Sequence, residues 1–67
     1  MQYIDVYYLD KRGKTVSRTT AVDSVERARG KAKTAIEKGL IFSAKREEHR
    51  IPPHRILEVI IREYGGA

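Results

Sequence analysis

The chain has 67 residues, with 14 lysines and arginines against 9 aspartates and glutamates and a formal net charge of +5. This length allows one small domain, and 40% hydrophobic with 34% charged residues is typical of a globular chain rather than a disordered tail. The sequence contains no cysteine, which excludes disulfide frameworks, cysteine-ligated zinc and thiol catalysis.

Apolar runs in this sequence are short. The longest runs of strong hydrophobes are Leu40–Phe42 and Val59–Ile61, far below the length of a membrane-spanning helix. The first five residues lack the basic start and apolar stretch of a signal peptide. We therefore expect a cytoplasmic protein with no membrane partner.

The first twenty residues predict a β-hairpin. Residues 2–9 alternate, with Ile4, Val6 and Tyr8 on one side of a strand. A polar turn at 10–13 ends in glycine, and residues 15–20 have the β-branched composition of a returning strand. Because that second strand is mostly polar, we expect it at a sheet edge.

The next segment predicts a helix. Asp23 is placed as its N-cap, with Glu26 three residues later in the position of a capping box. Gly39 follows as the C-terminal stop. The apolar residues recur every three or four positions and form one narrow, alanine-rich stripe: Val25, Ala28, Ala32, Ala35 and Ile36.

Two strands and a charged loop are expected in the remaining chain. Residues 40–43 predict a short third strand, and residues 45–54 predict a loop because Pro52 and Pro53 disfavour regular structure. Residues 56–64 alternate again and predict the last strand, with Leu57, Val59 and Ile61 on one side. Residues 1–64 thus form the domain and residues 65–67 a flexible Gly-Gly-Ala tail.

This element order predicts an α+β domain of two layers, β-β-α-β-β, with one helix packed on a four-stranded mixed sheet. Two topologies stay open. The first strand is central with the last strand parallel beside it, or a split β-α-β unit places the first strand antiparallel between its neighbours. In either case an apolar set faces away from the helix, mixed with Asp5, Glu58 and Arg62: Tyr3, Tyr7, Leu9, Ile41, Ile56, Ile60 and Tyr64.

Several segments, in the same order along most of the chain, resemble ubiquitin-like proteins of the β-grasp fold. Residues 13–16, Gly-Lys-Thr-Val, resemble the family's segment after the first turn, and residues 40–45, Leu-Ile-Phe-Ser-Ala-Lys, resemble its third strand. Residues 56–62 followed by Gly65 and Gly66 are similar to the final strand and diglycine tail. The resemblance implies a β-grasp sheet and a non-enzymatic protein that binds other proteins.

A protein-binding surface follows from this resemblance. It implies an apolar recognition patch at Ile41 and Ile60, with Tyr7 and Tyr64 beside it. Gly65 and Gly66 would form a tail through which the chain modifies other proteins. The open sheet face could also hold a second copy, so a monomer or a homodimer through that face is expected.

The basic charge supports an alternative, a small single-stranded nucleic-acid-binding protein. Tyrosines on the open sheet could stack bases, and the cations of the helix could contact phosphates. The residues of this interface would be Tyr3, Tyr7, Arg27, Lys31, Lys33 and Lys38. Asp5 and Glu58 on the same strands act against phosphate binding there.

No catalytic constellation stands out in the sequence. His49 and His54 lie five residues apart in the expected loop without a clear third ligand, and no glycine-rich phosphate loop is present. The serines lack an identifiable base. We therefore expect neither an enzyme nor a cofactor or metal site.

Overall fold

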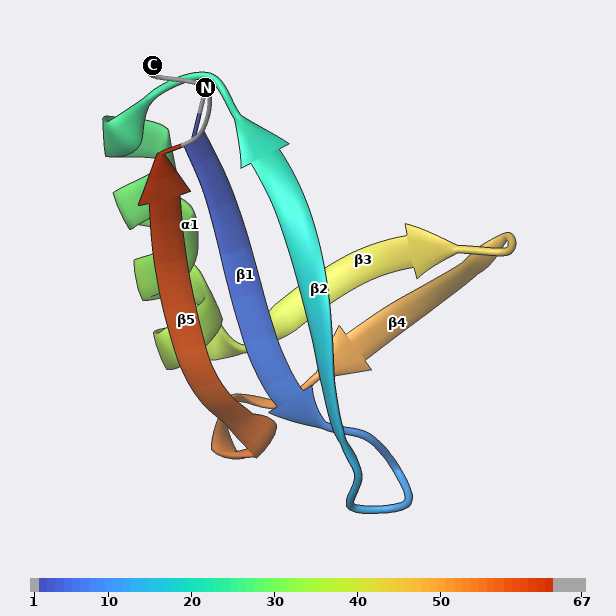
Figure 1. Cartoon of the computed structure of the whole chain (residues 1–67). Helices are drawn as coiled ribbons and strands as arrows, with labels where there is room; N and C mark the ends of the chain where they lie inside the picture. Colours follow the sequence, from blue (N-terminus) through green and yellow to red (C-terminus); the bar gives the residue numbers. More distant parts are fainter. Residues whose placement is uncertain (1, 64–67) are drawn as a thin grey trace.

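The computed structural model describes residues 2–63, which form one helix, a short 3-10 turn and five strands (Figure 1). Tyr64 and the expected tail of Gly65, Gly66 and Ala67 lie outside the described residues. The elements follow one another as β1 (Gln2–Leu9), β2 (Thr15–Val22), α1 (Val25–Lys38), β3 (Leu40–Ala44), β4 (Glu47–Ile51), η1 (Pro53–Arg55) and β5 (Ile56–Glu63).

The main sheet has three antiparallel strands in the order β2-β1-β5. An α+β domain with one helix is thus confirmed, and β2 lies at an edge as expected. The predicted four-stranded mixed sheet is wrong in strand number and in direction, because β5 runs antiparallel to β1 and the third strand leaves this sheet. Of the two expected topologies, only the antiparallel placement of the first strand between its neighbours is observed.

Strands β3 and β4 form a separate antiparallel hairpin, which we call the arm (Figure 1). The predicted charged loop at 45–54 is therefore wrong over β4. Lys45 and Arg46 make the two-residue turn, both with left-handed φ angles, of 52° and 63°. Phe42 opposes His49 in the register, and their rings stack at 5.0 Å, which gives this polar strand an apolar contact across the hairpin.

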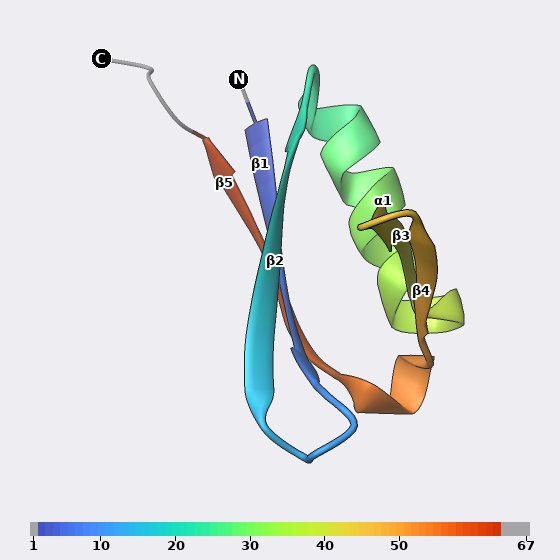
Figure 2. The same cartoon turned by 90° about the vertical axis from the view of Figure 1, so that its right-hand side faces the viewer.

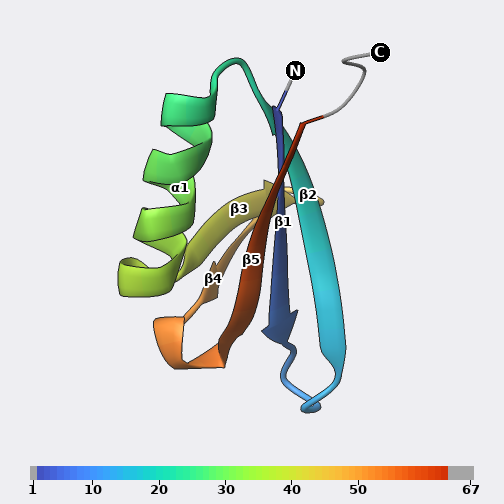
Figure 3. The same ribbon diagram turned by 60° about the vertical axis from the view of Figure 1, so that its left-hand side comes forward.

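Helix α1 covers one face of the main sheet and leaves the other face open (Figure 3). Its N-cap is Ser24, whose Oγ accepts a hydrogen bond from the backbone N–H of Arg27, rather than the predicted Asp23. Asp23 instead forms an exposed ion pair with Arg27. Gly39 ends the helix as expected, and its N–H donates to the carbonyl of Ala35.

The core lies between α1 and the sheet and is built from small side chains. Alanines at the contact let the helix approach the sheet closely, since Ala28 and Ala35 are both buried. Ile36, expected in the same stripe, is 61% exposed. The core cluster and the partly buried side chains packed on it are Ile4, Val6, Val22 and Ala28, with Tyr8, Leu40, Ile56, Val59 and Ile61.

A β-bulge in β5 changes which side chains face the helix. Tyr7 opposes Glu58 but Tyr8 opposes Ile56, so Leu57 is an extra residue in the ladder. Ile56 therefore packs against the core, and Leu57 is 52% exposed. The predicted faces of these two residues are reversed, whereas Val59 and Ile61 face the core as expected.

Candidate functional site

A cleft of about 810 Å³ opens between α1, β2 and β3, on the helix side of the main sheet. Figure 2 shows α1 and the arm on the same side of the main sheet, and the cleft is lined by residues of both and of β1 and β2. Its floor is apolar and its size is that of a small-molecule site rather than of a double helix. The apolar residues that line it include Ile4, Val6, Leu40, Ile41 and Phe42.

Four cations converge on this cleft. Arg18 comes from β2, and α1 contributes the other three at helical spacing: Arg27, Lys31 and Lys38. None of the described residues that line the cleft is acidic. The arrangement therefore attracts an anion that also offers an apolar surface to the floor.

Arg18 is held in place by an aromatic ring of the arm. Its guanidinium lies over Phe42 at 4.0 Å from the ring centroid, and Tyr8 lies tilted against the same ring at 6.4 Å. On β4, His49 stacks on Phe42 and approaches Glu47 at 3.5 Å. A guanidinium fixed over a ring can offer its other plane to a nucleobase, as arginines do in RNA recognition.

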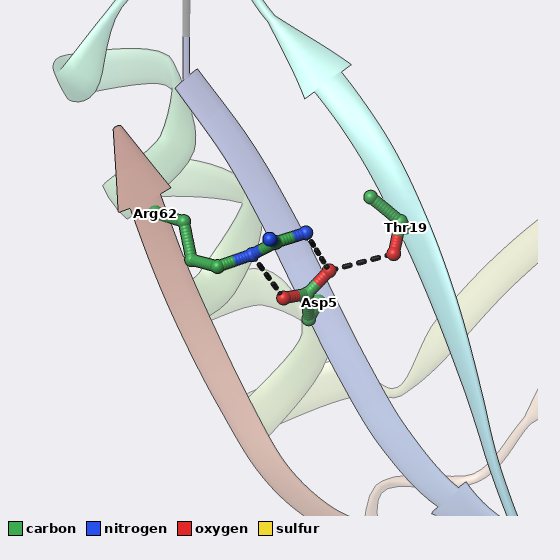
Figure 4. A network of polar contacts seen from close by, with 3 residues as sticks. All are labelled: Asp5, Thr19 and Arg62. Atoms are coloured by element: carbon green, nitrogen blue, oxygen red, sulfur yellow. Dashed lines mark hydrogen bonds and ion pairs between the residues drawn. The ribbon is translucent and has the colours of Figure 1, made fainter. Parts of the chain in front are cut away.

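The open face of the sheet carries a different, closed polar network (Figure 4). Asp5 is 6% exposed. Its carboxylate forms an ion pair with Nε of Arg62 at 2.5 Å and accepts a hydrogen bond from Nη2 of the same residue at 3.0 Å. The hydroxyl of Thr19 donates to the same carboxylate at 2.6 Å. These hydrogen bonds, first from Thr19 and then from Arg62, hold the pKa of Asp5 below its ordinary value.

The predicted protein-binding residues do not form one patch in the structure. Ile60 opposes Asp5 on the open face, together with Tyr7, whereas Ile41 lines the cleft on the helix side. Tyr64, Gly65 and Gly66 lie outside the described residues. A protein modifier with a diglycine tail therefore stays a prediction of the sequence.

The predicted nucleic-acid residues are divided between two surfaces. Tyr3 and Tyr7 lie on the open face, where Asp5 engages Arg62 and where the Arg62 guanidinium is 5.9 Å from the Tyr3 ring. Three of the four helix cations line the cleft, and Lys33 does not. From the sequence Arg18 counts among the basic residues of the hairpin but not among the residues of the interface, although it is the one charged residue of its strand.

Residues 2–63 hold no group of three histidines, aspartates or glutamates arranged to bind a metal ion. Within the same range, no helix has the length and apolar character that a membrane span needs.

Comparisons with protein-family models, with curated proteins and with solved structures find no match to this chain. The function is therefore inferred from the geometry alone.

Proposed function

We propose that the protein binds single-stranded nucleic acid in the cleft between α1, β2 and β3. One observation supports this proposal above all. Four cations line a cleft with an apolar floor, and no acidic residue among those described lines it: Arg18, Arg27, Lys31 and Lys38. Phosphates contact the cations, and a base stacks on the plane of the Arg18 guanidinium that is turned away from Phe42. A base can reach the guanidinium of Arg18 only when it is unpaired, so the proposal is for a single strand.

The turn of the arm supports the same proposal. Hairpins with two-residue turns of left-handed φ favour Asn-Gly, and bulky side chains there carry strain. This chain instead has Lys45 and Arg46 at the turn, which places two cations at the tip of the arm, beyond Glu47 and Glu48. Two cations at a strained position are consistent with a role for their charge rather than for the fold.

Salt dependence provides the first test. For four phosphate contacts with a single strand, the slope of log affinity against log salt is about −2.8, so raising salt from about 50 to about 200 mM weakens binding about 50-fold. We expect this slope for a fluorescent oligouridylate measured by anisotropy. The double variant Lys31→Gln/Lys38→Gln should lower the slope by about 1.4, because two of the contacts are lost.

The matched control is Arg29→Gln/Lys33→Gln. These two residues are exposed on the same helix but do not line the cleft, and the change in net charge is the same. This control should keep a slope close to that of the wild type. Equal losses in both double variants, or equal affinity for a duplex of the same sequence, would refute binding in the cleft. Stronger binding of polyglutamate than of oligouridylate would instead identify an acidic protein as the partner.

The turn variant Lys45→Asn/Arg46→Gly separates stability from binding. It places the favoured residues at both left-handed positions, so we expect the fold to become more stable by about 1 kcal/mol. It also removes two cations from the tip of the arm, so affinity for oligouridylate at low salt should fall several-fold if the strand extends from the cleft along the arm. Urea denaturation and anisotropy measure the two effects. A variant that is both more stable and an equally strong binder would show that the arm takes no part.

A further inference from the structure

The outer edge of β5 is a second candidate surface, separated from the cleft by β1. β5 is the last strand of the sheet order β2-β1-β5, and among residues 2–63 no strand pairs with its outer side. It is eight residues long and contains no proline. An edge of this kind is a template for pairing with another strand unless it is protected.

Exposed apolar side chains accompany this edge. Ile36 of α1 is 61% exposed and Leu57 of the bulge is 52% exposed. Both line a shallow hollow of about 240 Å³ between the end of the helix and β5. The helix thus leaves apolar surface at the very edge where a further strand would add, and large exposed hydrophobes in such a place mark a contact surface.

The residues of β5 are complementary to those of a second β5 running antiparallel. When Ile60 opposes Ile60 of the other copy, Glu58 opposes Arg62 at both ends of the pair, and Val59 opposes Ile61. Glu58, Ile60 and Arg62 lie on the open face, whereas Val59 and Ile61 belong to the core face. Both the charges and the apolar rows therefore match in this one register.

Other registers and the other edge lack this match. Moving the twofold axis from Ile60 to Val59 or Ile61 places Arg62 opposite an isoleucine, Ile56 or Ile60, so that Glu58 and Arg62 no longer meet. The edge strand β2 has Arg18 as its one charged residue, so self-pairing offers no opposite charge, and the arm reaches β2 through Phe42. The chemistry of the two edges thus favours β5.

We infer that the protein forms a homodimer in which the β5 edges of two copies pair antiparallel about a twofold axis at Ile60. The two three-stranded sheets become one continuous sheet, in which Leu57 of each copy lies opposite Glu63 of the other. Such an interface uses the same patch on both copies and closes after two subunits. Each subunit keeps its cleft of Arg18, Arg27, Lys31 and Lys38 on the far side of β1.

A single introduced cysteine tests the register, because the chain contains no cysteine of its own. Directly opposed residues in antiparallel strands have Cα atoms about 4.5–5.5 Å apart, within the range of a disulfide. Ile60→Cys should therefore cross-link to a uniform dimer under mild oxidation. Ser17→Cys is the control, since it lies on the same open face in β2. It should cross-link at least about tenfold more slowly.

A charge variant tests the interface without cysteine chemistry. Glu58→Lys turns two attractive pairs of the dimer into repulsive ones, and we expect the dissociation constant in sedimentation to rise about tenfold. Glu47→Lys makes the same charge change on the arm, away from β5, and should leave it unchanged. A wild-type chain that sediments as a monomer throughout the micromolar range overturns the inference. Cross-linking of Ser17→Cys as fast as Ile60→Cys does so too.

Discussion

Gly39→Ala is expected to destabilise the fold by on the order of 4 kcal/mol, enough to unfold most of the protein. Gly39 is buried with φ 91° and ψ −178°, a conformation that is essentially reserved for glycine. A Cβ atom there would lie 2.1 Å from the carbonyl oxygen of Ile51 and 3.1 Å from the nitrogen of Pro53. Backbone atoms cannot turn aside as a side chain can, so the helix end or the base of the arm must move.

Substitutions at two other glycines distinguish the cost of a positive φ angle from the cost of the steric clash of a Cβ atom at Gly39. Gly13 has φ 77° and a Cβ atom there would meet nothing within 4 Å, so Gly13→Ala carries the strain alone, about 1 kcal/mol. Gly30 lies in the middle of α1 with open space around it, and Gly30→Ala should stabilise the protein by up to about 1 kcal/mol. Urea denaturation measures the series. A Gly39→Ala protein as stable as Gly13→Ala would contradict the collision.

Arg62→Met is expected to lower the melting temperature by on the order of 10 °C at neutral pH. The substitution keeps most of the apolar length of the side chain, but in the network of Figure 4 it leaves the Thr19 hydroxyl alone to compensate the carboxylate of Asp5. Because Asp5 is buried whereas Arg62 is partly exposed, taking away a partner of the carboxylate is more harmful than removing the carboxylate together with that partner. The double variant Asp5→Leu/Arg62→Met should therefore be more stable than Arg62→Met.

Arg50→Met is the matched control, since Arg50 and Glu48 form a largely exposed ion pair on the arm. Exposed pairs contribute little, so the melting temperature should hardly change. If Arg50→Met and Arg62→Met have equal effects, the network of Asp5 does not stabilise the sheet.

The stability of the protein at acidic pH should depend on the same carboxylate, that of Asp5. Because the folded pKa of Asp5 lies below the ordinary value of 3.8, the native state binds fewer protons than the unfolded state in this range. Its contribution is present above that value and is lost as the pH falls through the lowered pKa. Urea midpoints of the wild type should therefore decrease in this window, and those of Asp5→Asn should decrease less. The pKa of Asp10 is lowered by hydrogen bonds from the backbone of Lys14 and Arg12. Asp10 therefore accounts for part of the decrease in urea midpoint that remains in Asp5→Asn.

The strong periodicities predicted the elements that carry the core. Alternation placed β1 and the inward side of Val59 and Ile61, and the helical spacing of alanines placed the buried side of α1. The direction of β5 could not be predicted in this way, because alternation is the same in parallel and antiparallel strands. Only the pairing in three dimensions, Ile4 with Ile61 and Val6 with Val59, shows that the strand runs antiparallel.

The arm and the cleft could not be predicted from the sequence, for a different reason. β4 is a strand of two glutamates, a histidine, an arginine and an isoleucine, and its pairing with β3 is what makes it regular. The cleft lies between this arm and α1. The sequence could therefore predict that the cations of α1 share a helix face, but it could not predict that they line a cleft. The bulge at Leu57 leaves no mark in the composition of β5, so the reversal of Ile56 and Leu57 was also hidden.

The order of the strands also bears on how the protein is made. The central strand β1 precedes α1 and the arm in the chain, whereas one of its two neighbours, β5, follows them and is synthesised later. Until Glu63 has emerged, β1 can pair with β2 alone, and a two-stranded hairpin is marginal in water. The part of the core that Val59 and Ile61 complete therefore closes only after synthesis of β5, and until then the nascent chain has α1 and β2 alone to cover Ile4 and Val6.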